Sequence, residues 1–387
     1  MLKRIPEPAL HALCAAFAAV VTVIGLPNHR VWAWWALCAY SAAALLTLLR
    51  PGARPAVVRL VTLGALVGPL AHLAATGRAQ NEVTAVFEAA RRLLDGRPLY
   101  PTGADLADAV ARSGVDAYFP YLPAMALLGV PAVLAARAGL GPVLSDPRLT
   151  FLLVHGVAVL FVARRTGAGR SGLWLVLVTS PPAALLLATG GHDLAVVGAL
   201  LVAVVLSRDG RPVAAGLVAG LACAAKLTAW PLVVALAAVD RRRFAVAGSA
   251  AAVVAVFLLP ASAAGLLVHD VRFPAGLEAV PSPAAAPFPG RLVAEHVPGG
   301  RVLAVVLLVA AAVVLLVRLA RRPPRGAAGA AFHCAAGLAA ATLLAPATRP
   351  GYLVYPLALL VVGLLVRDDD QRSSGGRSRT DVATPAG

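Results

Sequence analysis

The sequence has few charged residues. Asp, Glu, Lys and Arg make up 13% of its 387 residues, about half of the ~25% that is typical of a soluble domain. Hydrophobic residues make up 60%, and the mean hydropathy is +0.82. This composition excludes a soluble globular protein and predicts a polytopic membrane protein.

Acidic residues are scarcer than basic ones, 18 against 34, which gives a net charge of +16. The arginines gather in short loops between apolar runs, such as RPGARP, DRRRF and RRPPRG. Because basic loops next to membrane spans stay on the cytoplasmic side, this charge predicts orientation. We therefore expect membrane lipids as neighbours and no nucleic-acid partner.

Cysteine is also rare. The four residues, Cys14, Cys38, Cys223 and Cys334, lie inside apolar runs and form no CxxC pair. They indicate neither a redox motif nor a metal site, and we interpret them as small core residues.

Alternating strand segments of the barrel type are absent, and apolar runs of ~15–20 residues recur from Pro8 to Val366 instead. We count about twelve or thirteen, which predicts an all-α fold of transmembrane or re-entrant helices. The first run follows Lys3 and Arg4 but offers no small-residue cleavage site, so we expect it to remain as a span. Residues 1–366 are predicted to form one domain, and residues 367–387 a disordered cytoplasmic tail.

The basic loops predict that both termini are cytoplasmic in a plasma-membrane protein and that residues 78–120 and 265–300 form outer loops. This count needs an odd number of crossings between Pro120 and Arg164, where two apolar runs occur. Prolines interrupt the first run, which we therefore expect to be a re-entrant element lining a site. The count also assumes that residues 212–240 form two short helices broken near Lys226 and Pro231; the alternative is one long kinked helix.

The segment NEVTAVFEAARRLLDG, which begins at Asn81, predicts an amphipathic helix on the membrane surface. Its apolar positions at helical spacing are Val83, Val86, Phe87, Ala90 and Leu94. Asn81 is the expected N-cap and Gly96 the expected C′ residue, while Asp95 is expected to be a helix-end or salt-bridge residue. The alternative interpretation is an ordinary interfacial connector.

Polar residues stand out where the surroundings are apolar. Lys226 is isolated in LACAAKLTAWP, and a membrane-embedded lysine indicates a functional site unless its side chain snorkels to the headgroups. His192 and Asp193 follow two glycines in GGHD, and both side chains can form hydrogen bonds with a ligand. A divalent metal is conceivable there but not favoured, since no second ligand follows at i+4. Tyr100 and Tyr121 are typical of a membrane interface.

Four motifs resemble one family in their order. They are the Asn81 segment with GRPLYP, then AYFPYLPAM, then the block from GGHD through Lys226 to DRRRF, and finally PATRPGYLVYP. The order resembles that of the integral-membrane glycosyltransferases of the GT-C class, in particular glycosyltransferase family 87 with its actinobacterial mannosyltransferase-like proteins. The resemblance extends roughly from Gln80 to Val366.

The resemblance implies an inverting transfer on the outer face of a hexose, with mannose favoured, from a polyprenyl-phosphate donor to a lipid or glycan acceptor, without a cofactor. It implies that Glu82 is the catalytic base, where the family more commonly has Asp; Asp116 and Asp105 are the reserves. Lys226 would face the departing phosphate, and Arg349, beside Tyr352, could share this role or be an ordinary helix-end arginine. His192 and Asp193 would bond sugar hydroxyls, and Tyr100 and Tyr121 could contact sugar.

Two alternatives stay open at this point. A transporter or lipid flippase has similar hydropathy, although the paired halves typical of transporters are not visible. The second alternative is a family member that kept the fold and lost the catalytic activity, because glutamate replaces the usual aspartate.

Overall fold

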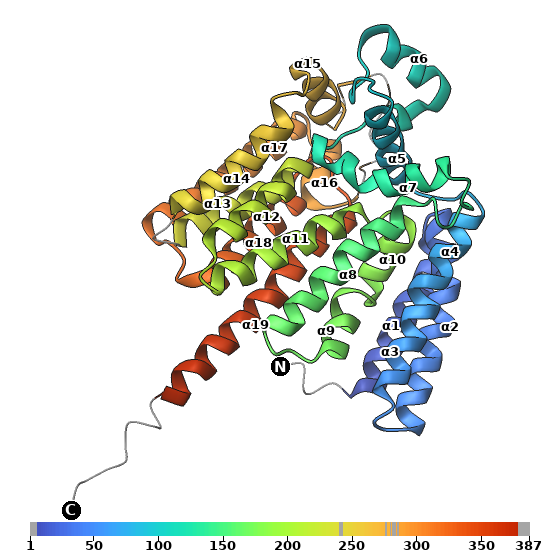
Figure 1. Ribbon diagram of the computed structural model, residues 1–387, viewed down its shortest axis with the longest axis vertical. Helices are drawn as coiled ribbons and strands as arrows, with labels where there is room; N and C mark the ends of the chain where they lie inside the picture. Colours follow the sequence, from blue (N-terminus) through green and yellow to red (C-terminus); the bar gives the residue numbers. More distant parts are fainter. Residues whose placement is uncertain are drawn as a thin grey trace, which may run out of the picture.

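The computed structural model describes residues 6–239, 243–274, 277–278, 280, 284 and 286–377. This part of the chain consists mostly of helices joined by short loops, and it contains no strand. Figure 1 shows that α5, α6 and α15 lie at one end of the molecule, whereas α19 runs away to the opposite end.

The N-terminal helices form a unit of their own. Its core consists mainly of alanines, with Trp32, Tyr40, three valines and Leu70, and helix α10 packs against it through Ala184 and Ala188. The elements are α1 (Glu7–Ile24), α2 (Pro27–Leu49), α3 (Arg54–Thr62), the π-helical turn η2 (Leu63–Val67) and α4 (Gly68–Ala75).

Short elements then cover the end of the molecule that carries the candidate site. They are α5 (Asn81–Leu94), α6 (Gly103–Ser113), the 3-10 helices η3 (Gly114–Ala117) and η4 (Pro123–Gly129), and α7 (Val130–Arg137). The first apolar run after Pro120 is therefore broken and short, as its prolines predict.

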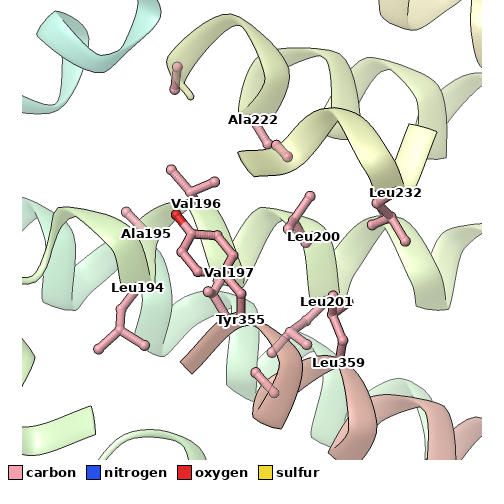
Figure 2. Packing of buried hydrophobic residues seen from close by; sticks show 14 of the residues in the cluster. Leu194, Ala195, Val196, Val197, Leu200, Leu201, Ala222, Leu232, Tyr355 and Leu359 are labelled. Atoms are coloured by element: carbon pink, nitrogen blue, oxygen red, sulfur yellow. The ribbon is translucent and has the colours of Figure 1, made fainter. Parts of the chain in front are cut away.

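The largest core surrounds α11, which is buried along most of its length. Leu194, Leu200 and Leu201 of this helix pack with Leu232 and Leu359 from neighbouring helices (Figure 2). The elements here are α8 (Pro147–Arg165), α9 (Arg170–Leu177), α10 (Pro181–Thr189), α11 (His192–Arg208), α12 (Pro212–Ala225), η5 (Leu227–Ala229), α13 (Trp230–Val239) and α14 (Arg243–Leu258).

The C-terminal part completes this core. Its elements are α15 (Ala263–Leu266), η6 (Leu267–Arg272), α16 (Pro289–His296), α17 (Gly300–Arg321), α18 (Gly326–Leu344), η7 (Pro350–Leu353) and α19 (Val354–Arg377). Helix α19 passes the boundary that we placed at Val366, so the first part of the expected tail continues the helix. The rest of that tail, residues 378–387, lies outside the described residues.

Seven helices of the described chain are long and apolar enough to cross a membrane, or up to nine if each of two bent pairs is one span. The bent pairs are α9 with α10, at 64°, and α14 with α15 and η6, at 101°. Three shorter apolar segments add to them: Pro123–Arg137, Pro212–Ala225 and Leu227–Val239. The predicted fold class, an all-α polytopic membrane protein, is confirmed.

Helix α5 differs from its prediction in two respects. Gly96 has φ +65°, and the amides of Gly96 and Arg97 bond back to Leu93 and Arg92, which confirms the C′ position. Asn81, however, is the first helical residue, because the N-cap position with extended backbone is Gln80. The apolar side of α5 packs on η4 and α7, so protein covers it. Its contact with the membrane surface stays a prediction.

Candidate active site

Two adjacent glycines bring His192 and Asp193 to the start of α11. Gly191 has φ +91°, a conformation that residues with a Cβ rarely adopt. A Cβ on Gly190 would lie 2.7 Å from the amide oxygen of Gln80. The backbone N–H of Gln80 also donates a hydrogen bond to the Thr189 carbonyl at 2.9 Å. The glycines therefore let the start of α5 approach the start of α11 closely.

Lys226 lies at the break between α12 and α13, where its backbone is extended. Its buried ammonium forms an ion pair with Asp193 and lies 3.2 Å from His192 Nε2. The Tyr355 hydroxyl donates to Asp193 Oδ1 at 2.6 Å. Snorkelling to the headgroups is thus the wrong interpretation, because Lys226 points into a polar cluster inside the protein. The expected break near Lys226 is confirmed.

Aromatic rings surround this ammonium. The Lys226 nitrogen lies 4.9 Å from the centre of the Tyr352 ring and 5.4 Å from that of Tyr121. The Tyr121 ring is also 4.7 Å from the imidazole of His192. Each ring face adds favourable cation–π attraction, which is strongest where water is excluded. The segment entering η4 therefore lines the cluster, and the Leu122 amide bonds to the Ala225 carbonyl at 3.0 Å.

Glu82 and Arg349 form a second, adjoining pair. Glu82, in the first turn of α5, is buried, and its carboxylate is paired with Arg349. Its Oε2 has no hydrogen-bond partner within the described structure. Arg349 stands directly before η7, and the Tyr352 amide donates to the Arg349 carbonyl at 3.1 Å. One turn of chain therefore connects the Glu82 pair with the Lys226 cluster.

Tyr100 belongs to the wall of the site and not to its centre. Its hydroxyl donates to the Tyr121 carbonyl at 2.8 Å, and its ring packs against Phe119 and His269. Burial, and to a smaller extent nearby Asp270, raise the pKa of Tyr100, so it remains a neutral donor. Its role is to hold the chain on which Tyr121 is presented.

The reserve carboxylates do not join Glu82. Asp116 accepts a hydrogen bond from the Asn81 side chain and lines a separate pocket on another face of α5. Burial raises its pKa, and the Asn81 bond partly opposes this. Asp105 is exposed in the first turn of α6. Asp95 pairs with Arg137, as expected of a salt-bridge residue.

Sequence patterns did not single out Tyr355 or Arg148. Buried Arg148 pairs with Asp146 and donates to the carbonyls of Ala188, at 2.7 Å, and Arg78, at 3.1 Å. These carbonyls precede the GGHD turn and α5, so Arg148 holds both together. One feature of the sequence does indicate Arg148: an arginine next to an apolar run needs a buried partner, and the aspartate of the DPR motif, Asp146, is that partner. Tyr355 had no such signal.

No group of three or more His, Cys, Asp or Glu side chains suited to a metal ion occurs within the residues that the structure describes. His192 and Asp193 lie together, but the Lys226 ammonium occupies the adjacent position. As placed, this donor set favours an anion or a hydroxyl ligand over a divalent cation.

Comparison with known proteins gives one match. The model of glycosyltransferase family 87 matches residues 118–346, more than half of the chain. No curated protein and no solved structure matches. The matched range holds Tyr121, His192, Asp193 and Lys226, whereas Glu82 lies before it and Arg349 after it. By this match the chain belongs to glycosyltransferase family 87.

Proposed function

We propose that this membrane glycosyltransferase moves a hexose, with mannose the favoured sugar, from a polyprenyl-phosphate donor to a lipid or glycan acceptor on the outer face. The observation that carries the proposal is the buried Lys226 cluster next to the Glu82–Arg349 pair. Such a transfer needs two kinds of group, fixed cations and a carboxylate. The short helix η7 connects the cluster and the pair that contain them within one turn of chain.

The cations suit the leaving group. When the anomeric carbon–oxygen bond breaks, negative charge remains on the lipid phosphate, and a preorganised ammonium or guanidinium stabilises it. Lys226 and Arg349 are these groups in our proposal. His192 and Asp193 would bond sugar hydroxyls, and Tyr121 and Tyr352 would contact the sugar ring.

An apolar pocket of about 400 Å³ supports a lipid-linked donor. It begins at Leu227, directly after Lys226, and runs between α13, α17 and α18. Leu308, Leu315, Leu316, Leu319, Leu338 and several alanines line it, with His333 as its charged or polar exception. An isoprenoid chain in this pocket would hold its phosphate near the Lys226 ammonium.

Glu82 would act as the base. Its buried carboxylate is paired with the Arg349 guanidinium, and its oxygen Oε2, which has no partner within the described structure, would accept the proton of the acceptor hydroxyl. That hydroxyl oxygen attacks the anomeric carbon while the bond to the phosphate oxygen breaks. Attack from the opposite side inverts the anomeric configuration.

The test is transfer of radiolabelled mannose from decaprenyl-phosphate mannose and related donors by purified protein in lipid. We expect transfer by the wild type and by Asp105→Asn, an exposed control, and a loss of at least about a hundredfold in Glu82→Gln. Asp116→Asn should remain active.

Other outcomes would support a different catalytic base or a different function. Loss in Asp116→Asn with an active Glu82→Gln would move the base to Asp116. No transfer by wild type with any donor, in folded protein, would favour a non-catalytic family member. Movement of labelled lipid across the membrane without transfer would favour the flippase function.

A further inference from the structure

A second concave site lies between α5, α6 and η3, away from the Lys226 cluster. It is a pocket of about 260 Å³ whose wall carries the arginines Arg91, Arg92 and Arg112. Ligand pockets for drug-sized molecules measure ~300–1,000 Å³, so this one suits a headgroup or a single phosphorylated ring.

The positive charge of the pocket is only partly balanced. Arg91 pairs with Glu88 at 2.7 Å. The guanidinium groups of Arg92 and Arg112 make no ion pair or hydrogen bond with any residue that the structure describes. Burial, and after it the like charges of Arg97 and Arg91, lower the pKa of Arg92, while Glu88 and Asp105 oppose this. A bound anion would add a counter-charge to this group.

The remaining wall supplies groups that complement an oxyanion. Thr84 and Ser113 provide hydroxyls, and the Tyr118 ring is held in place by stacking on Phe273 at 4.2 Å. Asp116 also lies in this wall and makes no ion pair with the residues that the structure describes. Two free guanidiniums with neighbouring hydroxyls are the recognition pattern of a phosphate group.

An exposed apolar residue adjoins the pocket. Leu93, which directly follows Arg92 in α5, exposes 44% of its surface, and Leu99 lies in the pocket wall. In a membrane protein an exposed leucine of this kind contacts lipid. A lipid headgroup at Arg92 would thus have its chains next to Leu93.

We propose that the pocket between α5 and α6 binds a phosphate ester, that of a lipid headgroup at the membrane surface, through Arg92 and Arg112. This inference does not depend on the proposed transfer, since it concerns binding alone.

The experiment measures binding of two probes to purified full-length protein: short-chain phosphatidylglycerol and glycerol 3-phosphate. The variants are Arg92→Gln and Arg112→Gln, with Arg97→Gln as a control that removes the same charge nearby without lining the pocket. We expect saturable binding that weakens about tenfold in each pocket variant and stays within about twofold in Arg97→Gln. Arg92→Lys and Arg112→Lys, which keep the charge, should bind with intermediate affinity.

The two probes distinguish the source of the phosphate. Binding of the lipid alone, with this pattern of variants, supports a membrane headgroup; binding of both probes at similar affinity supports recognition of the phosphate ester itself. Equal affinity in wild type, Arg92→Gln and Arg112→Gln overturns the proposal, as does an equal loss in Arg97→Gln, which indicates general surface charge. Thermal unfolding of every variant checks that it is folded.

Discussion

At the scale of the residue, Lys226 and Asp193 present the sharpest energetic problem of the site. Both are buried, and each is the other's main counter-charge. The Tyr355 hydroxyl and the ring of Tyr352 complete the shell around them. A buried ion pair contributes little to net stability, but removal of one partner leaves an uncompensated charge in a low-dielectric interior.

We expect Lys226→Met and Asp193→Asn each to lower the free energy of unfolding by ~3–5 kcal/mol. The double variant should recover most of that loss, because no buried charge remains, yet it should not transfer sugar. Thermal unfolding in detergent and the transfer assay measure the two effects. If the losses were additive, the pair would not be coupled; transfer by the double variant would remove Lys226 from the proposed mechanism.

Asp116 gives a prediction on pH. Burial raises its pKa in the folded protein above the unfolded value of ~3.9. The folded state then holds the proton more tightly, so stability falls as the pH rises through the interval between the two pKa values. Relative to wild type, Asp116→Asn should therefore gain stability from low to neutral pH.

Unfolding midpoints measured from about pH 4 to pH 7 check this difference. Asp105→Asn serves as the control, because the Asp105 side chain is exposed on α6 and the substitution removes the same charge. A difference between Asp116→Asn and wild type that does not change with pH would show that the Asp116 environment is not the one described.

At the scale of the element, α12 packs against α14 at very short range. A Cβ on Gly220 would lie 2.8 Å from both the Cα and the carbonyl oxygen of Ala250, so backbone and not a flexible side chain blocks it. Gly216, one turn earlier, approaches the backbone of Val246 in the same way. Small residues four apart are the usual means by which membrane helices approach closely. This contact positions the end of α12, and with it Lys226.

Gly220→Ala should lower the free energy of unfolding by roughly 1–3 kcal/mol, because the helices must separate or bend to admit the methyl group. Gly248→Ala on α14 is the matched control: a Cβ there meets no neighbouring atom, so stability should stay unchanged or rise by up to ~1 kcal/mol. Thermal unfolding of the two variants side by side gives the comparison. Equal effects would show that helix propensity, and not the close contact, dominates at Gly220.

The breaks between elements matter as much as the helices. Gly190 and Gly191 end α10, and extended Lys226 ends α12, so both polar groups project from helix ends. Sequence patterns indicated these breaks, because glycine pairs and an isolated lysine before a proline interrupt an apolar run.

The burial of Glu82 was not indicated by the sequence, since a first-turn glutamate on an amphipathic helix normally faces water. Its counter-charge, Arg349, lies far along the chain.

At the scale of the whole molecule, basic loops and the candidate site lie at opposite ends. The loops after α8 and α11 adjoin, since Arg165 pairs with Asp209 and Arg208 donates to the Arg165 carbonyl at 2.8 Å. The contacts Gln80 to Thr189, Asp193 to Lys226 and Glu82 to Arg349 join the other ends of these helices. The arrangement supports the proposal that the site faces outward and the basic loops inward.

Reporter fusions test this orientation. Alkaline phosphatase, which is active only outside the cytoplasm, should be active when fused after Gly114 and inactive when fused after Gly210. The reverse pattern would place the site on the cytoplasmic face, where a polyprenyl-phosphate donor of the proposed orientation would not be expected. A fluorescent protein at the same two positions should give the opposite result and controls for expression.

The sequence by itself determined the class of the protein: low charge and recurrent apolar runs require a membrane, and helices satisfy their own backbone there. It also located the polar positions that are costly in such a chain, Lys226 and the GGHD turn. Only the tertiary structure decided which of these groups meet. Lys226 finds Asp193, Glu82 finds Arg349, and Asp116 faces a different pocket. Such pairings depend on the packing of distant helices, and hydropathy and spacing carry no information about it.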